Sequence, residues 1–110
     1  MKLPNAKNAY IPKEKLTDYL LSETHTDGKT KAKFFRLIGL SEDNISKLEA
    51  VLLKVAATQP IKNISESIHG VKYVIDGEIQ SPTGKVAKLR TIWIVEPVKN
   101  RPRFVTAYPV

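Results

Sequence analysis

Residues 41–60, SEDNISKLEAVLLKVAATQP, decide the fold because a well-marked helix ends there and the hydrophobic period changes directly afterwards. Ser41 is a favourable N-cap, and Glu42 and Asp43 follow in the first turn, where the helix dipole favours acidic side chains. An apolar stripe with helical spacing then comprises Ile45, Leu48, Val51, Leu52 and Val55. Pro60 stops the pattern. The stretch therefore predicts a helix that ends before Pro60.

Two further helices are predicted upstream of this stretch. The first begins near Pro12, because proline is tolerated in the first turn, where its missing N–H is not needed. The second covers residues 31–38, with Thr26 or Asp27 as its cap and Gly39 directly after it. The first 60 residues thus form a helical half.

After Pro60 the period becomes two, and β-branched and aromatic residues become frequent. Four strands are predicted, over residues 61–68, 71–80, 86–96 and 103–108. Because the connections are short, successive strands form hairpins and hence an antiparallel meander. We therefore predict an α+β fold, in which three N-terminal helices pack on one face of a four-stranded antiparallel sheet. Residues 1–110 are expected to form a single domain, with a helical half (1–60) and a sheet half (61–110).

Alternation in the last two strands assigns their side chains to the two faces. The odd positions of 86–96 are mostly apolar and suit the helix-covered face, which includes Thr91 and Trp93. The even positions include Lys88 and Arg90 and suit the opposite face. In the last strand the core positions are predicted to be Val105 and Ala107, and the open-face positions Phe104, Thr106 and Tyr108. Such a face suits a phosphate backbone or stacked bases, and the alternative is an ordinary solvated sheet face.

Composition excludes several classes of site. Eighteen basic and eleven acidic residues give 18 − 11 = +7, which favours a polyanionic partner such as nucleic acid or an acidic protein. The absence of cysteine excludes disulfides, thiolate zinc sites and iron–sulfur clusters. His25 and His69 lack metal-ligand spacing, and the glycines form no phosphate-binding loop, so neither metal nor cofactor is predicted. No apolar run approaches the roughly 20 residues of a membrane helix, so a cytoplasmic protein without membrane contact is expected.

The segment from His25 to Phe35 carries the most suggestive chemistry. His25 lies just before a helix whose first turn includes Lys29 and Lys31, close to backbone N–H groups that can bind an anion. This combination would provide an acid or base and a phosphate clamp. The alternative is a polar loop, a helix cap and a solvated lysine face, with Phe34 and Phe35 in the core.

The chain also resembles a bacterial domain family of unknown function. Its members occur as small stand-alone proteins and as C-terminal modules of large adhesin- or toxin-like proteins. The resemblance rests on segments from both halves of the chain: Leu3-Pro4-Asn5-Ala6, Lys15–Leu21, His25 with Gly28 and Lys31-Ala32, Phe34-Phe35, Arg90-Thr91-Ile92-Trp93 and Val105–Pro109. It covers essentially the whole sequence but names no activity.

A second similarity is to toxin ribonucleases of the barnase–EndoU–colicin–RelE superfamily. It rests on His25, Gly28 and Lys31-Ala32 before a helix, followed by a four-stranded sheet that ends in Thr106-x-Tyr108-Pro109. The resemblance implies metal-independent RNA cleavage on a sheet face, by attack of a ribose 2′-hydroxyl on the adjacent phosphate. His25 would be the general base or acid, Lys31 a clamp, and Arg90 a phosphate ligand, with Thr106 and Tyr108 lining the site. The further substrate contacts would be Lys29, Lys88 and Phe104.

Three hypotheses follow. The first is a metal-independent endoribonuclease-like toxin domain, which requires a small acidic immunity or antitoxin-like partner. The second is a non-catalytic basic module that binds RNA or an acidic partner protein. The third is a small folded protein whose motifs serve packing alone. The first requires His25, Lys31, Arg90, Thr106 and Tyr108 to converge on one cleft, whereas the second requires only a contiguous positive surface.

Overall fold

The sheet contains four antiparallel strands in the order β1-β2-β3-β4. The computed structural model describes residues 1–21 and 29–110, and it describes side chains for all residues except 22–30. The strands are β1 (Asn63–Ser67), β2 (Gly70–Gln80), β3 (Val86–Val95) and β4 (Arg103–Pro109). Each pairs with the next along the chain, so the predicted meander is confirmed. β1 is shorter than predicted, and all five of its residues are exposed.

The three predicted helices occur where the sequence places them, and a short 3-10 helix that the sequence did not predict, η1 (Ala6–Asn8), precedes them. The helical segments that follow η1 in the described chain are α1 (Lys13–Lys15), the π-helical η2 (Leu16–Leu20), α2 (Lys29–Leu37), η3 (Glu42–Asn44) and α3 (Ile45–Thr58). Ser41 caps η3, because its side chain accepts a hydrogen bond from the Asp43 N–H and the Asn44 side chain accepts one from the Ser41 N–H. In this part of the chain no helix is long and apolar enough to cross a membrane.

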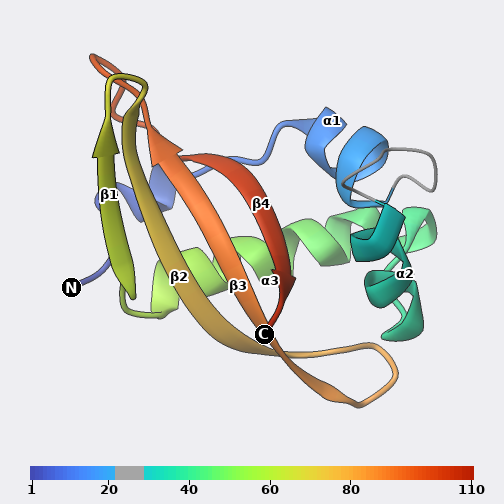
Figure 1. The fold of residues 1–110 in the computed structure, drawn as a ribbon. Helices are drawn as coiled ribbons and strands as arrows, with labels where there is room; N and C mark the ends of the chain where they lie inside the picture. Colours follow the sequence, from blue (N-terminus) through green and yellow to red (C-terminus); the bar gives the residue numbers. More distant parts are fainter. Residues whose placement is uncertain (22–28) are drawn as a thin grey trace.

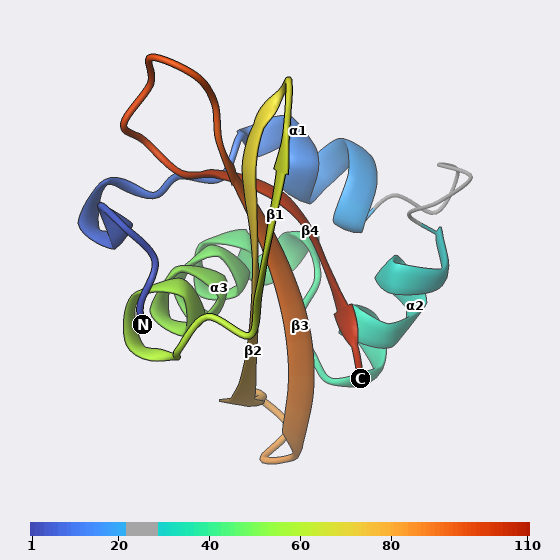
Figure 2. The same cartoon turned by 60° about the vertical axis from the view of Figure 1, so that its left-hand side comes forward.

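The helices occupy two places relative to the sheet (Figure 1). α3 lies across one face and contacts β2 and β3, whereas α1 and α2 contact β4. η2 continues α1 directly and packs against α2. In the rotated view, α2 stands beside the last strand rather than behind the sheet (Figure 2). No helix of the described chain crosses the opposite face, which we call the open face. The predicted α+β class is therefore confirmed, and the helices around η2 form a wall along one side of the open face.

The core between α3 and the sheet is apolar with one satisfied polar group. Trp93, Phe104 and Leu52 are fully buried in it. Thr91 is buried as well, and its hydroxyl donates to the Ile75 carbonyl at 2.8 Å and accepts from Trp93 Nε1 at 2.9 Å. Because both partners are supplied, the hydroxyl avoids the cost of an unsatisfied buried polar group. The predicted core-side positions of Thr91 and Trp93 are confirmed.

The prediction for Phe104 is wrong. Ile92 pairs with Thr106, but Trp93 pairs with Phe104, so Val105 is an extra residue in β4 and the alternation changes phase there. The bulge turns Phe104 into the core, where it packs edge-on against Trp93 with ring centroids 5.3 Å apart. Phe104 is therefore unavailable as a substrate contact on the open face, and Val105 is only half-buried instead of lying in the core.

Acid is expected to weaken the junction between α2 and η3. Arg36 donates to both carboxylate oxygens of Glu42, at 2.7 and 2.6 Å, and this pairing lowers the pKa of Glu42 to about 2 from its ordinary 4.5. A carboxyl group with a lowered folded-state pKa stabilises the fold above about pH 4.5, and the contribution disappears as the pH falls to about 2. At pH 7 the urea concentration at the unfolding midpoint should be higher for the wild-type protein than for Glu42→Gln. This difference should disappear by pH 2. An equal difference at both pH values would contradict the assignment.

Candidate functional site

The centre of the open face is an ion pair between two strands. Arg90 on β3 lies opposite Asp76 on β2 and Tyr108 on β4 in the strand register. The guanidinium donates to both Asp76 carboxylate oxygens, from Nε at 2.9 Å and from Nη2 at 3.0 Å. These bonds lower the pKa of Asp76, and they raise the pKa of Arg90 above its ordinary value, with a smaller contribution from Tyr108. The pair fixes the plane of the guanidinium beside the Tyr108 phenol.

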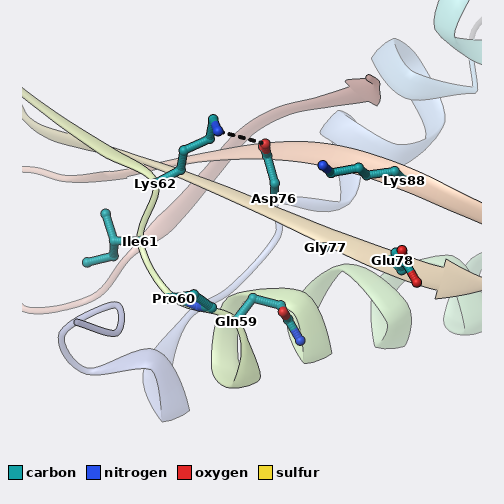
Figure 3. Close-up of a pocket in the computed structure, with 8 residues that line it drawn as sticks. All are labelled: Gln59, Pro60, Ile61, Lys62, Asp76, Gly77, Glu78 and Lys88. Atoms are coloured by element: carbon teal, nitrogen blue, oxygen red, sulfur yellow. Dashed lines mark ion pairs between the residues drawn. The ribbon is translucent and has the colours of Figure 1, made fainter.

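Two lysines extend the positive charge around this pair. Lys62, just before β1, has its Nζ 3.9 Å from Asp76 Oδ2, and its side chain is 56% exposed. Lys88 on β3 is exposed and also lowers the pKa of Asp76. Both ammonium groups point toward the Asp76 carboxylate from opposite sides (Figure 3). One carboxylate thus lies among three cations, Lys62, Lys88 and Arg90, so the surrounding charge is net positive.

A second cluster lies where the helical wall meets β4. Tyr19 of η2 and Thr106 of β4 share a hydrogen bond of 3.0 Å between their hydroxyl groups. Lys31 of α2 places its Nζ 5.4 Å from the centre of the Tyr19 ring, and Lys15 of α1 lies 4.9 Å from the same centre. Thr106 and Tyr108 are alternate residues of β4 and so share the open face, about 7 Å apart along the strand.

The two clusters together form a line across the open face, which we call the open-face row. From the helical wall to β1 it comprises Lys31, Tyr19, Thr106, Tyr108, Arg90, Asp76 and Lys62. It presents cations at both ends and at its centre, with hydroxyl groups between them. Such a row can hold phosphate groups through its cations and can orient or protonate an oxygen through its phenols.

Several of the residues predicted from the sequence come together in this row. Lys31, Arg90, Thr106 and Tyr108 all belong to it although they come from three different elements. Lys88 is on the same face, next to Asp76 rather than in the row. Phe104 is in the core. His25 lies outside the described residues, because residues 22–28 are not described. The side chain of Lys29 is not described either, because no side chains are given for residues 22–30.

Three members of the row were missed by the sequence reasoning. Asp76 and Lys62 carry a weak signal, since Asp76 occupies an even position of β2 in phase with Lys72, and Lys62 falls within the first predicted strand, 61–68. Tyr19 carries none, because its helical spacing from Leu16 and Leu20 in the sequence predicts a core side chain, and its hydroxyl meets Thr106 only through tertiary packing. Within residues 1–21 and 29–110, no group of three or more His, Asp or Glu side chains is placed to hold a metal ion.

The fold and its open face define a class: a small basic α+β domain with cationic and hydroxyl side chains lined up on the face of an antiparallel sheet that no described helix crosses. The chain belongs to the family described as Domain of unknown function (DUF6883), which matches residues 2–110. The predicted resemblance to a family of unknown function is in keeping with this result.

A solved structure with the same fold comes from a contact-dependent growth inhibition toxin–immunity protein complex of Klebsiella pneumoniae 342. The chain in that complex has 18% sequence identity and a TM-score of 0.76, and the match covers 94% of this chain and 95% of that one. At this identity the likeness establishes the fold. Comparison with curated proteins gave no match.

Proposed function

We propose that this domain is a metal-independent endoribonuclease of the toxin type, which cleaves RNA on the open face of its sheet. The observation that carries the proposal is the convergence of Lys31, Arg90, Thr106 and Tyr108 on one face, although up to 77 positions separate them in sequence (108 − 31). The net charge of +7 favours a polyanionic substrate. A domain whose motifs served packing alone would have no reason to expose these groups together.

In the proposed reaction, Arg90 holds a non-bridging oxygen of the scissile phosphate, and Lys31, at the end of the row beyond Tyr19 and Thr106, holds a neighbouring phosphate of the RNA. His25 removes the proton from the ribose 2′-hydroxyl, whose oxygen attacks phosphorus while the bond to the 5′-oxygen breaks. The leaving 5′-oxygen takes a proton from a hydroxyl or imidazolium of the site, and the products are a 2′,3′-cyclic phosphate and a 5′-hydroxyl. The Tyr108 phenol and the Tyr19–Thr106 hydroxyl pair are the hydroxyl groups of the row.

The proposed toxin role rests on a different observation from the one that supports RNA cleavage. The solved structure of matching fold comes from a complex of a toxin with its immunity protein. A nuclease acting in the cell that makes it requires an inhibitor, and a basic open face favours an inhibitor with an acidic surface. We therefore propose a small acidic partner protein that covers the open-face row.

The test is cleavage of single-stranded RNA by the purified protein in the presence of EDTA. We expect cleavage with cyclic-phosphate ends, and Arg90→Ala should reduce the rate by about tenfold or more because a fixed phosphate donor is lost. Lys72→Ala, which removes an exposed lysine of β2 outside the row, is the charge-matched control and should change the rate little.

Two additions keep this test decisive. Arg90→Ala leaves the Asp76 carboxylate, only 12% exposed, without its main partner, so the double variant Asp76→Ala/Arg90→Ala separates loss of phosphate binding from loss of stability. Salt-sensitive RNA binding by the wild-type protein without any cleavage would instead identify a non-catalytic binding module. Cleavage that disappears in EDTA would contradict a metal-independent mechanism.

A further inference from the structure

A hollow opens beside the centre of the open-face row, toward β1. It has a volume of about 390 Å³ and is lined by Lys62, Asn63, Val74, Arg90 and Tyr108. Asn63 and Val74 are direct cross-strand partners, as are Arg90 and Tyr108, so the lining comes from all four strands and the residue before β1. Pockets of about 300–1,000 Å³ are the usual size for small ligands. We call this space the Asn63 hollow.

The chemistry of the lining matches one nucleotide. Tyr108 contributes an aromatic ring and Val74 an apolar side chain, which suit the faces of a base. Asn63 contributes an amide with both donor and acceptor groups, which suits a base edge. Lys62 and Arg90 contribute two cations, which suit the phosphate groups on either side of that base.

The neighbouring hollow on the other side of Lys62 is larger but less suited to this ligand (Figure 3). Its volume is about 520 Å³, and its charged lining consists of Lys62, Lys88, Asp76 and Glu78. Two cations and two anions leave that space without net charge, whereas the Asn63 hollow is lined by Lys62 and Arg90, whose shared partner Asp76 lies outside its lining. Two cations share the single carboxylate of Asp76, so one positive charge is left over for a phosphate, and the smaller hollow is the better nucleotide site.

We propose that the Asn63 hollow binds one nucleotide of single-stranded RNA next to the scissile phosphate, and that Asn63 selects its base. The inference rests on the proposed function, because Arg90 and Tyr108 belong both to the hollow and to the row that holds the scissile phosphate. Stacking on Tyr108 supplies affinity for every base, whereas the Asn63 amide supplies the preference among bases. RNA cleavage by this domain is thus sequence-selective at the position adjacent to the cut.

The first experiment measures binding and does not require cleavage. The four ribonucleoside 3′-monophosphates are titrated into the isotope-labelled protein, and dissociation constants are obtained from NMR shifts. We expect shifts at Asn63, Val74 and Tyr108, and a preference among the bases that Asn63→Ala reduces about tenfold. Tyr108→Ala should weaken all four nucleotides by similar factors. Ser65→Ala is the matched control, because Ser65 is exposed on the same face of β1 but does not line the hollow.

The second experiment measures cleavage of four RNA tetranucleotides that differ at the base next to the cut. Asn63→Ala should make the kcat/KM values of the four tetranucleotides similar to one another, whereas Ser65→Ala should leave their differences unchanged. If Asn63→Ala keeps the wild-type base preference, or if the nucleotides leave the hollow unperturbed while an acidic peptide shifts it, the inference is overturned. Absence of cleavage by the wild-type protein, together with selective nucleotide binding at Asn63, would overturn the proposed reaction and support the nucleotide site.

Discussion

Replacing His25 with alanine is expected to lower the rate of RNA cleavage at least about a hundredfold while the fold is retained, because general acid–base help is worth about 10²–10⁴ in rate. The proposal for His25 comes from the sequence. The elements on either side of it in the chain, η2 and α2, form the helical wall beside β4, where Tyr19 bonds Thr106 and Lys31 lies over Tyr19. The described residues on both sides of His25 in the sequence therefore lie beside the row that would hold the phosphate.

The measurement for His25 is the initial rate of RNA cleavage, in parallel with bacterial growth after expression without a partner. His69→Ala is the matched control, since His69 is the other histidine of the chain and lies exposed in the turn between β1 and β2. It should leave both cleavage and toxicity unchanged. A His25→Ala protein that cleaves RNA within threefold of the wild-type rate would remove His25 from the mechanism.

Replacing Trp93 with alanine is expected to reduce the free energy of unfolding by about 3–5 kcal/mol, the usual cost of truncating a buried aromatic side chain to alanine. Trp93 has no exposed surface, packs edge-on against Phe104 and donates to the Thr91 hydroxyl. Its removal leaves a cavity beneath β3 and takes one of the two partners from Thr91. Since small domains are stable by only about 5–15 kcal/mol, this loss is a large fraction of the total.

The loss at Trp93 is measured by urea unfolding at pH 7, as a fall in the midpoint at an unchanged slope. Leu37→Ala is the control, because Leu37 at the end of α2 is 69% exposed and its truncation should change the stability by no more than about 0.5 kcal/mol. A loss below about 1 kcal/mol for Trp93→Ala would mean that the aromatic pair is not central to the core. Trp93→Phe should fall between the wild-type protein and the alanine variant, because it keeps a ring but not the N–H donor.

Much of the candidate site was predictable because strand alternation is a local property. The even positions of β3 and the last residues of β4 place Arg90, Thr106 and Tyr108 on one face as soon as the strands are recognised. Lys31 could be predicted as a site residue only from a sequence motif, because the position of a lysine in a helix has no fixed relation to a distant sheet. Its place beside Tyr19 depends on how α2 packs against η2.

The sequence by itself determined the order of elements, the Ser41 cap, the end of α3 before Pro60 and the two faces of β3, because each depends on residues only a few positions apart. Tertiary structure decided the rest. The bulge at Val105 moved Phe104 into the core, and the strand register placed Asp76 against Arg90. The packing of η2 beside β4 brought Tyr19 to Thr106. These contacts join residues 14 to 87 positions apart, so they depend on the register and packing of the whole chain rather than on any local pattern.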